Sequence, residues 1–112
     1  GARATSNMMI ERYNQSVLNA VRDVAINGTR LQTLNEQRVM QMERVDATHY
    51  TQAAADAAYQ RGLSSRLLAT EAKLPVIAED MSLLVIDTQR LMQNIQLIKA
   101  LGGGYQAPAN KK

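Results

Sequence analysis

The chain has 112 residues, enough for one domain, with 13 Lys and Arg against 10 Asp and Glu and a formal net charge of +3. The basic residues are scattered, so the concentrated basic stripe of a nucleic-acid-binding protein is missing. Cysteine is absent, which excludes disulfides and thiolate metal sites, and Phe and Trp are absent too. The apolar residues are Leu, Ile, Val, Met and Ala, which suit long helices packed side by side. No stretch approaches the roughly 18 to 20 apolar residues of a membrane-spanning helix.

The first expected element is a helix over about residues 5–60. Two rows of residues, three positions apart, repeat every seven residues: Ile10, Val17, Val24 and Leu31, and Tyr13, Ala20, Asn27 and Leu34. This spacing is the a/d pattern of a coiled coil, which weakens through Arg38 and Gln41 and recovers at Val45. Gly28 lies inside the helix at a cost of about 1 kcal/mol relative to Ala. We expect it to permit close packing of another helix.

The helical pattern breaks once, at about residues 61–64. Gly62 suits the left-handed conformation that ends many helices. Ser64 is predicted as the N-cap of the next helix, because a serine oxygen can accept the unpaired N–H groups of a helix start. Leu63 and Leu68 would then occupy the two positions of a hydrophobic staple. The sequence therefore predicts a tight tip between two helices.

The second expected helix covers about residues 65–101. Its main rows repeat every seven residues: Thr70, Ile77, Leu84, Leu91 and Ile98, and Leu67, Leu74, Met81, Thr88 and Ile95. A second apolar row comprises Leu68, Leu83, Ile86, Leu97 and Leu101. Because a helix with two apolar stripes packs against more than one neighbour, we expect partners, either other copies or other parts of the same polypeptide.

Pro75 removes one backbone donor from the second helix and should bend it. Asp87 and Arg90 form the one favourable close charge pair, at i,i+3. Residues 102–112 begin with three glycines and are expected to be a flexible C-terminal tail. The predicted fold class is all-α: a long antiparallel helical hairpin, coiled-coil-like, over residues 5–101.

Residues that could carry catalysis or bind a metal or cofactor are not predicted anywhere in the chain. His49 is the single histidine and has no Cys or carboxylate at ligand spacing, so a surface or interfacial role is expected. Glu79 and Asp80 are adjacent and would point in different directions on a helix. Ser64 and Ser65 have no histidine beside them and are expected to cap. We therefore predict that the chain is not an enzyme and needs no cofactor.

Three stretches together carry a family resemblance: "ERYNQSVLNAVRDVAINGTRLQTL", "AYQRGLSSRLLATEAKL" and "LIKALGGGYQAP". In this order and at these separations they resemble the C-terminal part of the TolC-family outer membrane factors, in the MdtP-like multidrug-resistance branch. The resemblance covers roughly residues 10 to 106. The "ALGGGY" ending after a long helix is specific, whereas the heptads are not.

The resemblance implies a homotrimeric tunnel that crosses the outer membrane and continues as an α-helical barrel through the periplasm. Helical hairpins form the barrel, and their tips meet a periplasmic adaptor protein that links the tunnel to an inner-membrane pump. The implied function is passive conduction of exported drugs, with no nucleic acid involved. Since no strand pattern precedes Tyr13, we expect a C-terminal fragment of the periplasmic portion, joined to the outer membrane through parts absent from this chain.

Four tip residues are implied to contact the adaptor. Gly62 falls on the family's tip glycine, in a motif usually written Val-Gly-Leu or Val-Gly-Thr. Leu63 fits this motif, whereas Arg61 replaces the valine, and Ser64 completes the contact candidates.

Three further residues near the tip are implied to line or gate the entrance. Tyr59 matches an aromatic residue just before the tip. Glu71, followed by Ala72, falls on the family's Asp-Ala pair, whose acid can line the constricted entrance; a solvated helix carboxylate is the alternative. Arg66 has no assignable counterpart and either pairs with Glu71 or faces the adaptor.

A competing interpretation is a structural coiled-coil hairpin, such as a segment of a periplasmic adaptor or of an unrelated scaffold. An adaptor hairpin should be flanked by lipoyl-like β segments and should lack the "ALGGGY" ending, which this chain has.

Overall fold

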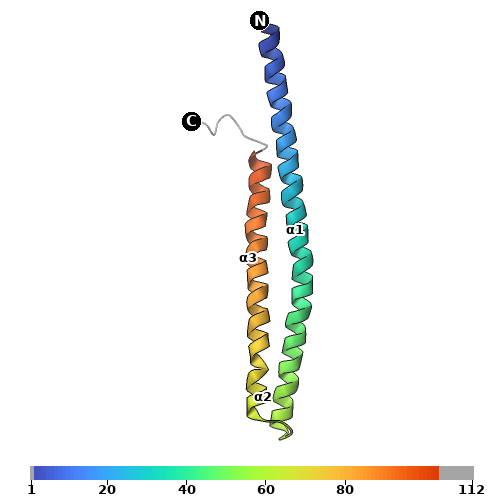
Figure 1. The fold of residues 1–112 in the computed structure, drawn as a ribbon, viewed down its shortest axis with the longest axis vertical. Helices are drawn as coiled ribbons and strands as arrows, with labels where there is room; N and C mark the ends of the chain where they lie inside the picture. Colours follow the sequence, from blue (N-terminus) through green and yellow to red (C-terminus); the bar gives the residue numbers. More distant parts are fainter. Residues whose placement is uncertain (1, 104–112) are drawn as a thin grey trace. The chain divides into compact units, whose positions relative to one another are not determined.

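A computed structural model describes residues 2–103, which form helices and contain no strand. Helix α1 spans Ala2–Gln60, α2 spans Arg66–Glu71 and α3 spans Lys73–Gly103 (Figure 1). The all-α fold class is confirmed. Gly102 and Gly103 belong to α3, whereas the rest of the expected tail, residues 104–112, lies outside the described residues.

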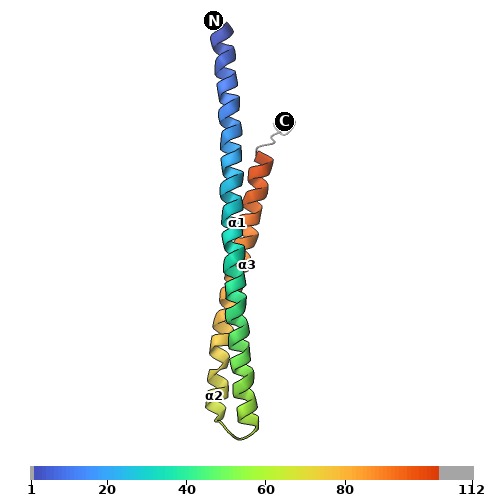
Figure 2. The same ribbon diagram turned by 90° about the vertical axis from the view of Figure 1, so that its right-hand side faces the viewer.

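Contacts divide the chain into two units, Thr33–Arg90 and Gly1–Gln32 with Leu91–Lys112. In the unit Thr33–Arg90, the end of α1 turns into α2 and α3, which run back along it in the opposite direction (Figure 2). This unit is by itself an antiparallel helical hairpin. The other unit pairs the first part of α1 with the last part of α3.

Two facing sets of residues, one on each side of the hairpin, hold this unit together, and we call them the seam. On α1 the seam residues are Leu34, Arg38, Gln41, Val45, Thr48, Gln52 and Ala55. On α2, on α3 and at the break between them, the seam residues are Ala69, Ala72, Val76, Glu79, Leu83, Ile86 and Arg90. Val45, Ala69, Val76 and Gln41 are buried, and the others are half-buried. On α1 the seam continues the predicted rows through Arg38 and Gln41 to Val45, as the sequence indicates.

Polar bonds of the seam residues join the two sides of the hairpin unit at two levels. The buried Gln41 donates from Nε2 to the backbone carbonyl and to Oε1 of Glu79, each at 3.0 Å. At the end of this unit away from the turn, Arg38 Nε donates to Asp87 Oδ1 at 2.7 Å, and Arg90 Nε donates to Asn35 Oδ1 at 2.7 Å. The predicted Asp87–Arg90 pair is present at 3.1 Å. The bonds of Gln41 satisfy the buried polar side chain of this unit, which would otherwise be destabilising.

The main rows identified in the second helix do not face α1. All ten of those positions are exposed, among them Leu84 at 66% and Ile77 at 55%. The seam instead takes Leu83 and Ile86 from the second row, together with the polar Glu79 and Arg90. The physical reason lies on α1, whose seam carries Arg38 and Gln41: polar side chains on one helix need polar partners on the other.

In the other unit, α1 and α3 are joined by Gln93, whose Nε2 donates to Asn27 Oδ1 at 2.6 Å. Residues 2–18 of α1 are all exposed, and within this unit α1 continues past the end of α3 (Figure 1). A Cβ added at Gly28 would meet no atom within 4 Å. The predicted close packing at Gly28 is therefore wrong for the described residues; beside it the helices are bridged by the side-chain bond between Gln93 and Asn27.

Where one helix is expected over about residues 65–101, the structure has two, interrupted at Ala72. Pro75 has no N–H to donate to the carbonyl of Glu71, four residues earlier, and its ring crowds that carbonyl. The N–H of Ala72 closes α2 by donating to the carbonyl of Leu68 at 3.0 Å. The disturbance predicted at Pro75 thus takes the form of a break one turn before it.

Candidate functional site

The turn after α1 is closed by backbone hydrogen bonds and a left-handed glycine. Gly62 has φ of +73°, as predicted. Its N–H donates to the carbonyl of Tyr59 at 3.0 Å, and the N–H of Leu63 donates to the carbonyl of Ala58 at 2.8 Å. This pair of bonds is the Schellman motif, which satisfies carbonyls at a helix end. The tip therefore has a defined backbone shape.

Ser65, not Ser64, caps α2. The Ser65 side chain accepts the N–H of Leu68 at 3.2 Å, with Ser65 in extended conformation at φ −81° and ψ 155°. The prediction of Ser64 as N-cap is wrong by one residue. The Schellman motif extends to Leu63, and one further residue, Ser64, connects it to the start of α2. The predicted Leu63–Leu68 staple is lost with it, since those residues no longer occupy the staple positions around the cap.

The tip presents an apolar side chain between polar ones. Leu63 is 77% exposed. Arg61 and Gly62 are exposed as well, whereas Ser64 is half-buried. Tyr59, in the last turn of α1, is 38% exposed. The four predicted contact residues thus lie consecutively in one turn, at the end of the hairpin unit.

Arg66 is the first residue of α2 and Glu71 the last. Both are exposed, and no hydrogen bond or ion pair joins them in the described part of the chain. Residues five apart lie about 140° apart around a helix, so these side chains leave α2 on different sides. Of the two alternatives for Arg66, the structure does not show the pairing with Glu71.

His49 meets a carboxylate that sequence spacing could not reveal, with its Nε2 3.3 Å from Asp80 Oδ1 on the facing helix. The adjacent Glu79 instead bonds Gln41, as expected for neighbours that point in different directions. Among residues 2–103, no group of His, Cys, Asp or Glu has the arrangement to hold a metal ion. Within the same range, no helix combines the length and apolarity needed to span a bilayer.

Residues 1–103 match the outer membrane efflux protein family. The chain belongs to this family. It is 76% identical over 107 residues to the multidrug resistance outer membrane protein MdtP of Escherichia coli strain K12, which covers 96% of the chain. The MdtP protein of Shigella flexneri is 75% identical over 96% of the chain, and MdtQ of Escherichia coli O6:H1 is 40% identical over 94%.

This family membership confirms the resemblance stated from the sequence, including its MdtP-like branch. The chain spans 22% of the length of these relatives. No solved structure shows a significant match to it.

Sequence reasoning expected both serines to cap but assigned the N-cap of the second helix to Ser64 instead of Ser65, and it missed the polar bonds of the seam. For Ser65 the signal was present, since two adjacent serines offer two possible caps and only the length of the turn decides between them. For the seam, the alignment of Gln41 with Glu79 and of Arg38 with Asp87 depends on how the two helices pair, which spacing within one helix does not specify.

Proposed function

We propose that this chain is a periplasmic helical hairpin of an outer membrane efflux channel, and that its tip docks onto a periplasmic adaptor protein. Membership of the outer membrane efflux protein family supports the channel role, and the relatives' names supply the multidrug resistance context. The full-length parent would be a homotrimer in the outer membrane, connected through the adaptor to an inner-membrane pump. Conduction would be passive.

The observation that carries the docking role is the exposed, backbone-fixed turn at Gly62 and Leu63. Leu63 is 77% exposed although the chain around it is held by the Schellman bonds and the Ser65 cap. A fixed turn loses little conformational entropy when it binds, and an exposed leucine supplies apolar area to bury. A plain turn between helices would not need both a fixed backbone and an exposed leucine.

Tyr59 and Glu71 are proposed to line the entrance of the channel. Glu71 is exposed at the end of α2, next to the break at Ala72. A ring of carboxylates at a constriction favours cations. Glu71→Gln in the full-length parent is therefore expected to lower the preference for cations over anions in planar-bilayer conductance. Unchanged selectivity would instead mean that Glu71 is a solvated helix carboxylate.

The docking role can be tested by placing a photo-cross-linking amino acid at Leu63 in the full-length parent, in cells that also express candidate adaptors. Tyr50 is the matched control, because it is 78% exposed but lies on α1 away from the turn. We expect Leu63 to capture the hairpin tip of an adaptor and Tyr50 not to do so. Capture of only other copies of the same chain, or of nothing, would favour the structural-hairpin interpretation over docking.

A further inference from the structure

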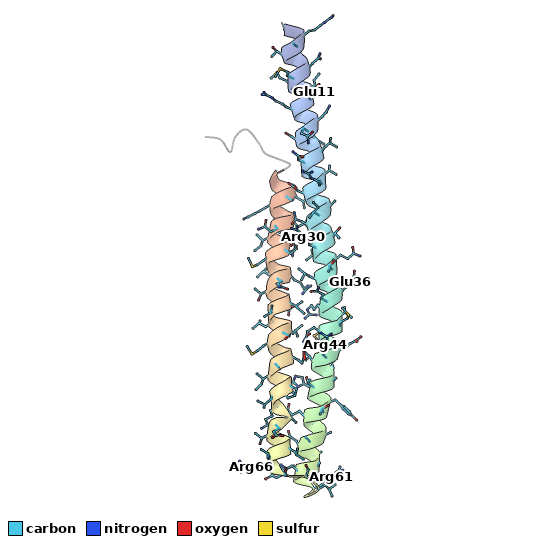
Figure 3. All side chains as sticks on the ribbon, in the orientation of Figure 1. Glu11, Arg30, Glu36, Arg44, Arg61 and Arg66 are labelled. Carbon is cyan, nitrogen blue, oxygen red and sulfur yellow. The ribbon has the colours of Figure 1, made fainter. Side chains whose placement is uncertain are left out.

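We propose that the protein docking on the tip presents carboxylates to Arg61 and Arg66, on either side of an apolar seat for Leu63. This inference rests on the proposed docking function and adds the chemistry of the partner. Figure 3 shows Arg61 and Arg66 at the same end of the hairpin unit, one following α1 and the other opening α2. The two cations therefore flank the turn that carries Leu63.

The tip arginines differ from the other arginines of the unit Thr33–Arg90. Arg38 bonds Asp87, Arg90 bonds Asn35 and Asp87, and Arg44 donates to Gln41 at 3.4 Å. Arg61 and Arg66 are exposed, and within residues 2–103 neither guanidinium group makes a hydrogen bond or ion pair, although the backbone groups of both residues are bonded. Within the unit Thr33–Arg90, the guanidinium groups on the helix shafts are thus bonded internally, whereas the two at the tip remain available.

Among residues 2–103, no carboxylate is placed to neutralise this charge. Residues 57–70 contain Arg61 and Arg66 and no acidic residue. The flanking acids are Asp56, half-buried on α1, and Glu71, on a different side of α2 from Arg66. A docked partner would remove water from both guanidinium groups, and a desolvated charge without a counter-charge is strongly unfavourable. Tight docking therefore requires acidic groups from the partner.

The number and type of the cations favour a protein partner over other anions. Recognition of acidic membrane surfaces uses clusters of about four to eight Lys and Arg, and nucleic acid needs a basic stripe; the tip has two arginines beside one exposed leucine. The planar guanidinium matches a carboxylate in a two-bond geometry that fixes orientation. The backbone bonds that hold Gly62 and Leu63 would keep this pattern in register with a complementary surface.

The test combines the Leu63 cross-linker in the full-length parent with charge changes at the tip. Arg61→Glu and Arg66→Glu are each expected to reduce adaptor capture about tenfold, since reversal removes an attraction and adds a repulsion. Arg61→Gln and Arg66→Gln should have smaller effects. The matched control is Arg30→Glu, because Arg30 is an exposed residue of α1 whose side chain makes no hydrogen bond or ion pair within residues 2–103. This variant makes the same charge change away from the tip and should leave capture unchanged.

A partner Asp or Glu changed to Arg should restore capture by the reversed tip, which would identify the facing carboxylate. If the unaltered tip captures an adaptor and the tip reversals behave like the Arg30 control, the carboxylate inference is overturned while the docking function stands. If the unaltered tip captures no adaptor, the docking function itself fails. Loss of binding to anionic lipid vesicles with unchanged adaptor capture would also overturn the inference, in favour of a membrane surface.

Discussion

Alanine substitutions at Gly62 and at Gly28 should change stability in opposite directions. Gly62 has φ of +73°, whereas Gly28 lies inside α1. At both positions an added Cβ would meet no atom within 4 Å, so neither substitution creates a clash. The difference between them comes only from the backbone conformation, which makes the pair a direct test of the tip geometry.

For Gly62→Ala, the left-handed conformation costs an L-residue about 1–2 kcal/mol. Alanine also lowers the conformational entropy of the unfolded chain, which offsets this cost by about 0.4–1 kcal/mol. The net loss of unfolding free energy should be about 1 kcal/mol. For Gly28→Ala, helix propensity predicts a gain of about 1 kcal/mol. The two variants should therefore differ by about 2 kcal/mol.

Urea unfolding followed by far-UV circular dichroism would measure both values. Gly62→Asn is a useful third variant, because asparagine tolerates the left-handed region better than alanine and should fall between the wild type and Gly62→Ala. If Gly62→Ala were as stable as the wild type, the left-handed turn would not exist in solution. If Gly28→Ala were destabilising, the space at Gly28 would be filled by a neighbouring helix after all.

Two further predictions concern α2, α3 and the seam. Pro75→Ala should restore the N–H donor to Glu71, join α2 to α3 and raise the free energy of unfolding by at most about 3 kcal/mol; slower amide exchange at Ala72 and Lys73 would show the repaired helix. The guanidinium of Arg38, followed by that of Arg90, lowers the pKa of the Asp87 carboxyl below its ordinary value of 3.8. The stabilisation from ionised Asp87 is therefore present above pH 3.8 and is lost as the pH falls through the lower folded-state pKa. Wild type should exceed Asp87→Asn in stability near neutral pH, and the gap should close in acid; a gap that persists in acid would mean that charge is not its cause.

The features that the sequence predicted correctly are those decided by local chain chemistry. The end of α1 and the left-handed Gly62 follow from the conformational freedom of glycine, and the Asp87–Arg90 pair follows from helix spacing. The features predicted wrongly depend on the path of the turn or on contacts between helices. Ser64 and Ser65 are equally good caps until the path of the turn is known. The facing rows of α3 could not be chosen, because counting apolar residues selects the row of Ile77 and Leu84, whereas pairing is decided by polar residues on α1.

The face of α3 that meets α1 is more polar than the face that stays exposed. A net contribution of about 0.5–1.5 kcal/mol per hydrogen bond is modest, while complete burial of a Leu or Ile side chain contributes about 1.5–3 kcal/mol. Leu74, Ile77, Met81 and Leu84 are each 55–66% exposed, so most of that apolar stabilisation is unused in the hairpin unit. An apolar row of this extent marks a face that packs against other helices. The polar bonds at Gln41 and Asp87 therefore fix which side of α3 meets α1, and within the described residues the apolar side stays exposed.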